Sequence, residues 1–309
     1  MKGVAIVAAA VLASLSIDAT EARSRVLFGF NDTPETFARE APMAEAARAR
    51  VARIAVSWET VERQPGRYDW SQLDAAVGAL EAREISQLLA ISAAPPWAAP
   101  ECELLLFMSC GVGAGHLPDY VGFVTALLDR YPGSRVQSWN EPNLPQFGDM
   151  APAWTARLTR AADRAAPGRV IGPAAGPAEP RQWNYLENVY RQLPETIPMA
   201  VHLYPRSGFF AGGGLEDYWR RAERIAGGRP VWVTEVGFAE SEYGADGQAR
   251  KSVRALVALA RAGARAVIVH RLRDEHFAWS AWLSSLGVLA ADGAPKPAYE
   301  ALRRAAADL

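Results

Sequence analysis

The sequence predicts an α/β protein folded as a single (β/α)8 TIM barrel. Short, β-rich apolar runs alternate with longer segments of helical periodicity, which is the order that parallel strands joined by crossover helices require. Eight such runs can be counted, and this number matches a closed eight-stranded barrel. A chain of 309 residues that is 50% hydrophobic can bury one large core, and barrels of this size often form one domain.

The eight predicted strands are short apolar runs that end at turn residues or at helical segments. In chain order they are Val26–Phe30, Arg53–Trp58, Gln87–Ser92, Val136–Trp139, Val170–Pro173, Ala200–Tyr204, Val231–Glu235 and Ala266–His270. An open, doubly wound sheet is the alternative architecture, but it normally carries a phosphate-binding glycine loop after an early strand. The sequence contains no such motif, so the barrel is favoured.

Helices are predicted between and after these strands, where apolar residues recur at helical spacing. They are Ser71–Arg83, Pro118–Tyr131, Pro152–Ala165, Arg181–Gln192, Leu215–Ile225, Gln248–Ala262 and Pro297–Ala306. In a barrel of this kind the carboxyl ends of all strands meet at one face, where reactive groups cluster.

The charge and the few metal-binding side chains restrict the classes of function. The 33 basic and 34 acidic residues give a net charge of -1, so nothing favours binding to nucleic acid or to an anionic membrane. Four histidines without close spacing and two cysteines offer no recognisable zinc or iron cluster. We therefore expect a neutral substrate such as a polysaccharide, and neither a metal ion nor another cofactor in catalysis.

The N-terminus has the features of a secretory signal peptide. A basic residue near the start precedes the apolar segment Val4–Leu15, and small residues follow at Ala19 and Ala22. The apolar segment is shorter than the about 20 residues that span a bilayer. We expect cleavage after Ala22, or alternatively after Ala19. Cleavage after Ala22 divides the chain into a signal peptide, 1–22, and a mature domain, 23–309, which is expected to be secreted or periplasmic and monomeric, without a membrane span.

Export makes a disulfide between Cys102 and Cys110 plausible, because it places both cysteines in an oxidising compartment. They flank a short apolar run in a loop bounded by proline and glycine. The alternative is a pair of buried thiols. A disulfide here is expected to staple a loop near the carboxyl ends of the strands.

Two glutamates indicate the chemistry. Glu141 lies within Trp-Asn-Glu-Pro-Asn after the predicted fourth strand, and Glu235 ends the predicted seventh strand. Acid-catalysed cleavage of a glycosidic bond uses two carboxyl groups, one to protonate the leaving oxygen and one to stabilise or attack the sugar carbon. A glutamate in an Asn-Glu-Pro turn can instead bond only a loop amide, but the second glutamate at a strand end favours carbohydrate cleavage.

Other polar residues also lie at the carboxyl ends of predicted strands. His202 and Tyr204, on the sixth strand, are two residues apart and therefore project to the same side. Asn31 and Asp32 follow the first strand. The barrel mouth is therefore expected to be polar.

Together these motifs resemble the clan A glycoside hydrolases, and most closely the family 39-like retaining glycosidases of cellulase and β-xylosidase type. The resemblance covers nearly the whole mature chain. It rests on Arg53–Trp58, Gln64–Trp70 with Leu73–Asp74, Arg130–Gly133 with Trp139–Asn143, His202–Tyr204, and Gly287–Leu289 with Asp292–Tyr299.

The resemblance implies a glycoside hydrolase that acts by a retaining double displacement on an oligo- or polysaccharide, for example a bacterial exopolysaccharide. Glu141 is the implied acid/base and Glu235 the implied nucleophile. A barrel that binds glycans without cleaving them is one alternative. A transglycosylase, in which a sugar hydroxyl intercepts the covalent intermediate, is another.

The resemblance also implies supporting roles around the two glutamates. Asn140 is expected to bond the hydroxyl beside the reacting sugar carbon. Arg53 is expected to keep the nucleophile ionised, and Tyr204 to orient it. His202 is expected to hold the acid/base or a substrate hydroxyl.

Tryptophans are the expected platforms for sugar rings, and the end of strand eight departs from the family pattern. Many clan members have a tryptophan there, below the reactive sugar, whereas this chain has His270 and Arg271. Trp279 or Trp282 is expected to replace it. Further stacking candidates near strand ends are Trp58, Trp97 and Trp139.

Overall fold

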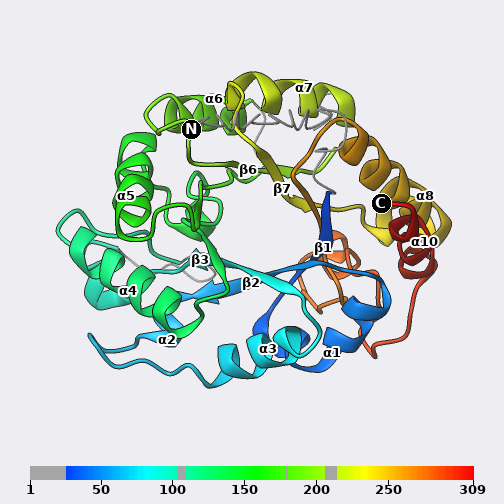
Figure 1. Ribbon diagram of the computed structural model, residues 1–309, viewed down its shortest axis with the longest axis horizontal. Coiled ribbons are helices and arrows are strands. Elements are labelled where there is room, and N and C mark those ends of the chain that lie inside the picture. The colour runs from blue at the N-terminus through cyan, green and yellow to red at the C-terminus, as the bar shows by residue number, and fades with distance from the viewer. Residues whose placement is uncertain (1–25, 103–108, 178–179, 206–213) are drawn as a thin grey trace, which may run out of the picture.

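The structure is a computed structural model that describes residues 26–102, 109–177, 180–205 and 214–309. It is an eight-stranded parallel barrel with helices around the outside (Figure 1), so the predicted fold is confirmed. The predicted signal peptide and the apolar run between the two cysteines lie outside the described residues. Within the described ranges, no helix has both the length and the apolar character that a membrane span requires.

Neighbouring strands pair in parallel in the order β5-β4-β3-β2-β1-β8-β7-β6. Between β5 and β6, the ends of this order, the Gly172 amide donates to the Pro198 carbonyl at 2.9 Å, which brings the barrel close to closure. The strands are β1 (Leu27–Asp32), β2 (Val51–Ser57), β3 (Ser86–Ser92), β4 (Arg135–Gln137), β5 (Val170–Ile171), β6 (Met199–Leu203), β7 (Val231–Val236) and β8 (Ala266–His270).

Helices connect the strands on the outside of the barrel (Figure 1). The α-helices are α1 (Pro34–Ala46), α2 (Trp58–Val61), α3 (Ser71–Glu81), α4 (Leu117–Arg130), α5 (Pro152–Ala165), α6 (Arg181–Tyr190), α7 (Leu215–Ala226), α8 (Glu240–Arg261), α9 (Ala281–Ser284) and α10 (Pro297–Ala305). Short 3-10 helices are η1 (Pro96–Ala98), η2 (Pro145–Phe147) and η3 (Ala306–Asp308).

Helix α1 was not among the predicted helices, although it fills the expected position between the first two strands. The Thr33 side chain caps it by accepting a hydrogen bond from the Thr36 amide, and Pro34 occupies the first turn. Pro42 lies inside the helix, where a proline removes a backbone donor and usually interrupts helical structure. That proline obscures the helical pattern in the sequence.

The ends of several elements also differ from prediction. Helix α8 begins at Glu240 instead of Gln248, because a first turn joins it across Gly244, whose φ is +68°. Strand β1 extends to Asp32, so Asn31 and Asp32 belong to the strand itself. Trp58 opens α2 instead of ending β2. Trp58 therefore lies at the start of a helix instead of at the end of a strand.

The apolar core has two parts. The larger part packs the barrel against the helices. The smaller cluster draws residues from most strands of the barrel: Val51, Leu88, Ile171, Ala174, Ala200, Trp232, Ala266 and Ile268. Because side chains two apart share a face of a strand, Val51 in this cluster places Arg53 on the same side, nearer the carboxyl end of β2.

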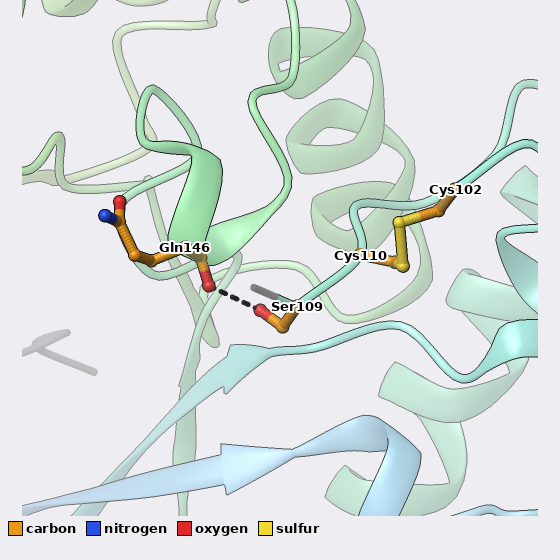
Figure 2. The surroundings of a disulfide bond; sticks show 4 residues. All are labelled: Cys102, Ser109, Cys110 and Gln146. Carbon is orange, nitrogen blue, oxygen red and sulfur yellow. Dashed lines mark hydrogen bonds between the residues drawn. A yellow bond between two sulfur atoms is a disulfide. The ribbon is translucent and has the colours of Figure 1, made fainter. Parts of the chain in front are cut away.

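The disulfide between Cys102 and Cys110 is present, with Cα atoms 5.8 Å apart (Figure 2), so that prediction is confirmed. The Cys110 carbonyl accepts a hydrogen bond from the Ala94 amide just after β3. Next to it, the Ser109 hydroxyl donates to the Gln146 carbonyl at 2.7 Å. Since Gln146 lies in the loop that follows Glu141, the disulfide-bonded loop braces a segment next to a predicted catalytic residue.

Substitution of Gly29 by Ala is expected to destabilise the barrel strongly. A Cβ atom at Gly29 in β1 lies 1.7 Å from the Val51 carbonyl oxygen in β2, so the paired strands must move apart. Overpacking costs about 1–3 kcal/mol and more where the backbone must shift. Urea denaturation is expected to show a loss of about 3 kcal/mol or more in the free energy of unfolding.

The matched control is Gly78→Ala in α3, where an added Cβ meets nothing within 4 Å. This variant is expected to be unchanged or more stable by about 0.5–1 kcal/mol, because Ala is the better helix former. Equal stability of the two variants contradicts the predicted clash between β1 and β2.

Candidate active site

The two predicted catalytic glutamates lie together at the carboxyl ends of the strands. Glu141 follows β4 and Glu235 lies in β7, and they are 8% and 6% exposed. One carboxylate oxygen of Glu141 lies within 4.8 Å of one of Glu235. The fold therefore brings together two carboxyl groups that are 94 positions apart in the chain.

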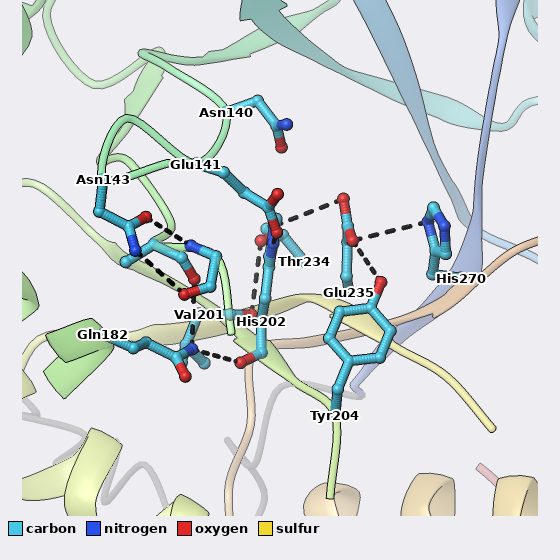
Figure 3. Close-up of polar contacts among 12 residues, drawn as sticks. Asn140, Glu141, Asn143, Gln182, Val201, His202, Tyr204, Thr234, Glu235 and His270 are labelled. Carbon is cyan, nitrogen blue, oxygen red and sulfur yellow. Dashed lines mark hydrogen bonds and ion pairs between the residues drawn. The ribbon is translucent and has the colours of Figure 1, made fainter. Parts of the chain in front are cut away.

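Glu235 is surrounded by hydrogen-bond donors. Its Oε1 accepts from Arg53 Nη1 at 2.7 Å, and its Oε2 accepts from the Tyr204 hydroxyl. His202 Nε2 and His270 Nδ1 lie 3.5 and 3.6 Å from its two oxygens (Figure 3). Tyr204 is therefore positioned to orient the Glu235 carboxylate, as the family resemblance implies.

These neighbours set the charge of Glu235. Burial alone would raise its pKa, but the nearby side chains of His202, His270, Arg53 and Tyr204 together lower the pKa to about 2. Burial in turn lowers the pKa of His270 to about 4, so that ring is neutral at pH 7. Arg53 is therefore the permanent positive charge beside the Glu235 carboxylate at neutral pH.

Arg53 is 2% exposed, and each of its guanidinium nitrogens is engaged. Besides Glu235, it donates to Asn31 Oδ1 at 2.5 Å, to Asn140 Oδ1 at 2.6 Å and to Gln137 Oε1 at 2.9 Å. The family resemblance implies that Arg53 keeps the nucleophile ionised, and its contact with Glu235 Oε1 fits that role. With all its donor atoms committed, it holds the other polar groups of the site in place.

Asn140 is oriented by its contact with Arg53. Because a guanidinium only donates, the Asn140 atom facing it is the carbonyl oxygen. The amide Nδ2 then has no hydrogen-bond partner within the described part of the chain and remains available to a ligand. The backbone is fixed as well, since the Asn140 amide donates to the Ile91 carbonyl at 2.8 Å.

Glu141 is held by its own backbone and by the loop after β5. Its φ is +44°, a region that non-glycine residues rarely adopt, and its amide donates to the Ala174 carbonyl at 2.9 Å. Asn143 exchanges two hydrogen bonds with the Gly176 backbone, of 2.7 and 3.1 Å. A Cβ at Gly176 would lie 2.9 Å from the Glu141 carboxyl carbon. The two loops therefore fix the direction of the Glu141 side chain.

His202 lies next to both carboxyl groups (Figure 3). Its Nδ1 is 2.8 Å from Glu141 Oε1, whereas its Nε2 is buried without a hydrogen-bond partner and faces Glu235 Oε1 at 3.5 Å. The Gln182 side chain donates to the His202 carbonyl at 2.9 Å, which fixes the backbone below the ring. The imidazole is therefore positioned to share a proton with Glu141.

Glu141, His202 and Glu235 each offer a potential metal ligand, and the three atoms lie within 4.8 Å of one another. Glu235 Oε1, the oxygen nearest His202, already accepts a hydrogen bond from Arg53. A metal ion at this point would face the guanidinium charge. The arrangement therefore fits proton transfer among these groups better than metal coordination.

The predicted aromatic platforms have different outcomes. Trp58 and Trp139 are 0% and 1% exposed, so the assignment of both as sugar platforms is wrong. The Trp58 ring stacks on Phe123, and Trp139 Nε1 donates to the Phe147 carbonyl. Both therefore belong to the core. Trp97 is half-buried against Trp58, and its role as a platform stays a prediction.

Of the two candidates after strand eight, Trp282 lies nearer the glutamates. Its ring centroid is 5.5 Å from that of Tyr204, whose hydroxyl donates to Glu235. Trp279 is 66% exposed and contacts Phe277, so its role in substrate binding stays a prediction.

Three polar positions of the site were not assigned roles from the sequence. Gln137 and Asn31 both accept hydrogen bonds from Arg53, and His270 contacts Asn31. Asn31 and His270 lie at strand ends, and that position is the signal that points to them. Gln137 ends β4 and is fully buried, and a buried polar side chain requires a hydrogen-bond partner within the barrel.

Known proteins support the interpretation as a carbohydrate-cleaving enzyme. A family model described as the glycosyl hydrolase catalytic core matches residues 125–272, a range that includes both glutamates. The resemblance to glycoside hydrolases that the motifs predict is therefore confirmed. A search of the curated proteins found no match.

Solved structures share the fold. A family 39 glycoside hydrolase from Bacteroides cellulosilyticus WH2 superposes with a TM-score of 0.69 at 19% identity, over 92% of this chain and 64% of that one. A GH5_18 protein from Streptomyces cattleya, in complex with Manβ1-4GlcNAc, has the same TM-score and identity over 91% and 80%. Xylanase B from Clostridium stercorarium F9 has a TM-score of 0.67 at 15% identity over 91% and 97%. This chain thus spans less than two thirds of the family 39 structure.

Replacement of Arg53 by Met is expected to raise the pKa of Glu235. An adjacent arginine typically lowers a carboxyl pKa by about 1–3 pH units, and Arg53 is one of the positive groups that lower this one. A ¹³C NMR titration of glutamate-labelled protein measures the change. Arg191→Met, which removes an exposed partner of Glu187, is the control and is expected to leave the Glu235 pKa unchanged.

The lowered pKa also has a consequence for stability. A carboxyl group with a depressed folded-state pKa stabilises the fold above its ordinary pKa of 4.5, and this contribution disappears as the pH falls toward about 2. The contribution is expected to be smaller in Arg53→Met. An unchanged Glu235 titration in that variant contradicts the role assigned to Arg53.

Proposed function

We propose that this glycoside hydrolase cleaves β-glycosidic bonds of an oligo- or polysaccharide by a retaining double displacement. Glu235 is the nucleophile and Glu141 the acid/base. The observation that carries the proposal is the unequal surroundings of two adjacent carboxyl groups. Glu235 is kept ionised by donors and positive charge, whereas the Glu141 carboxyl lies against the imidazole of His202.

The separation of the carboxyl groups supports retention. Retaining enzymes place the two groups about 5–5.5 Å apart, whereas inverting enzymes need about 6.5–9.5 Å to admit a water molecule. Oxygens of Glu141 and Glu235 lie within 4.8 Å of each other, which is compatible with direct attack by Glu235 on the sugar carbon. Covalent attack and protonation of the leaving oxygen then occur from neighbouring positions.

In the first step, Glu235 attacks the anomeric carbon while Glu141 donates its proton to the leaving oxygen. In the second step, Glu141 removes a proton from water, which hydrolyses the glycosyl ester on Glu235. His202 holds Glu141 in position for both steps, because its Nδ1 lies at hydrogen-bond distance, 2.8 Å, from Glu141 Oε1. Asn140 Nδ2 bonds the hydroxyl beside the reacting carbon, a contact that strengthens as charge develops on the ring.

A β-linked substrate is supported by similar structures, and a largely neutral one by the small net charge of the protein. The structural neighbours include a protein in complex with Manβ1-4GlcNAc, a xylanase and an exo-β-1,4-mannosidase. A net charge of -1 gives this protein little attraction for a strongly charged polymer. We therefore propose a largely neutral β-glycan, with bacterial exopolysaccharides among the substrates to test.

Substitution of either glutamate by Gln is expected to abolish most of the hydrolysis. Loss of a general acid typically costs about 10²–10⁴-fold in rate. Glu141→Gln is expected to be least impaired on aryl β-glycosides with good leaving groups, which need little protonation, whereas Glu235→Gln is impaired on all substrates. Release of reducing sugar and of the aryl group measures both effects.

The control is Glu187→Gln, which removes an exposed carboxylate on α6 and is expected to retain full activity. ¹H NMR of the first-formed product identifies the anomer and thus tests retention. Binding of a glycan without any cleavage by the wild type favours the glycan-binding alternative. Products longer than the substrate favour transglycosylation.

We also propose that the mature domain acts outside the cytoplasm. The disulfide fits an oxidising compartment, and the N-terminal sequence resembles a signal peptide. Mass spectrometry of the exported protein is expected to find an N-terminus at Arg23. Retention of residues 1–22 in a cytoplasmic product contradicts this assignment.

A further inference from the structure

We propose that His270 donates a hydrogen bond from Nε2 to a hydroxyl group of the reacting sugar, a polar contact at the end of β8, where the family that the motifs resemble has an aromatic ring. The inference rests on the proposed function and specifies the kind of sugar that the reacting position accepts. His270 ends β8 and lies 3.6 Å from the Glu235 carboxylate.

A chain of hydrogen bonds from Arg53 determines which nitrogen of His270 carries the proton. The Arg53 guanidinium only donates, so the Asn31 atom 2.5 Å from it is the carbonyl oxygen Oδ1. The Asn31 amide nitrogen Nδ2 therefore faces His270 Nδ1, at 2.7 Å. Because an amide nitrogen only donates, Nδ1 accepts. In the neutral ring the proton is then on Nε2.

The charge and position of the ring are also fixed. Burial lowers the pKa of His270 to about 4, with Glu235 and Asp32 acting in the opposite direction and Arg271 and Arg53 acting with burial. At neutral pH the imidazole is therefore uncharged, with one tautomer selected. The Tyr204 ring packs edge-on at 6.0 Å and limits rotation of the imidazole.

Nε2 is the last atom of this series of hydrogen bonds. The His270 side chain is 18% exposed, and its Nε2 has no hydrogen-bond partner in the part of the chain that the structure describes. The ring faces Glu235 through Nδ1, 3.6 Å from Oε2, and Nδ1 already accepts from Asn31. Nε2 is therefore the nitrogen of this ring that is left to donate to a sugar held for attack by Glu235. An N–H group at this point requires an oxygen acceptor, which a sugar hydroxyl supplies.

The neighbouring charge favours a neutral sugar over a uronic acid. Arg271, the adjacent cation, is 5% exposed and is paired with Asp32 at 2.5 Å and with Glu275. Its charge is thus balanced by two carboxylates and is not available to a sugar carboxylate. A neutral imidazole donor therefore selects a hydroxyl group at this side of the reacting sugar.

The protonation state is tested by ¹⁵N NMR of histidine-labelled protein. The chain has four histidines, so the His270 resonances are identified by their absence from His270→Gln. The expected spectrum at pH 7 shows a protonated Nε2 and an unprotonated Nδ1. A proton on Nδ1, or a charged ring at that pH, overturns the proposal. This measurement requires no knowledge of the substrate.

The contact with the sugar is tested by removing either partner. The experiment compares kcat/KM for aryl β-glycosides and for their monodeoxy analogues. It uses the wild type and His270→Phe, which keeps a ring but removes the donor. One deoxy analogue is expected to lose about tenfold in kcat/KM with the wild type and to lose nothing further with His270→Phe. His270→Gln, which restores an N–H donor, is expected to recover part of the discrimination.

Equal penalties for every deoxy analogue in the wild type and in His270→Phe overturn the proposed contact, whatever the tautomer. A better substrate among the uronides than among the neutral glycosides overturns the proposed selectivity. Failure of the wild type to hydrolyse any glycoside counts against the proposed function instead. In that case the same deoxy comparison is made on binding of the free sugars by calorimetry, with the same two outcomes for His270.

Discussion

The buried guanidinium of Arg53 is the constraint on which the rest of the site depends. A charge inside a barrel is tolerated only when it is paired and its donors are satisfied. Arg53 meets this condition with Glu235 and three side-chain carbonyl oxygens. Each of these contacts also has a chemical consequence. The contact with Glu235 favours the ionised carboxylate, and those with Asn140 and Asn31 force both amide nitrogens to point away from the guanidinium.

The acid/base side of the site is built differently, from backbone instead of charge. Glu141 has a positive φ and hydrogen-bonds the segment after β5, and Asn143 fixes the same segment through Gly176. His202 links this half to Glu235 by lying close to both carboxyl groups. Because the two glutamates have separate supports, their environments can differ although they are adjacent. Such a difference is what allows one carboxyl group to act as nucleophile and the other as acid.

The parts of this architecture that follow from local pattern were predictable. Apolar runs located the strands, and strand ends located both glutamates. Ring direction was not predictable in the same way: Trp58 lies at a strand end, yet it opens α2 and packs on Phe123. Contacts set by strand register were also hidden, since Asn31 and His270 are 239 residues apart in sequence. They meet only because β1 and β8 are neighbours in the barrel.

The same register connects the residue at the end of β8 to the support of the catalytic pair. Asn31 pairs with His270 across β1 and β8, and it lies between Arg53 and the imidazole in the hydrogen-bond chain. His270 therefore needs no separate group to fix its proton, because the hydrogen-bond chain through Asn31 begins at Arg53, which also donates to Glu235. The barrel thus separates two tasks: residues below the mouth fix charge and proton positions, and the residue at the end of β8 determines what the sugar must offer.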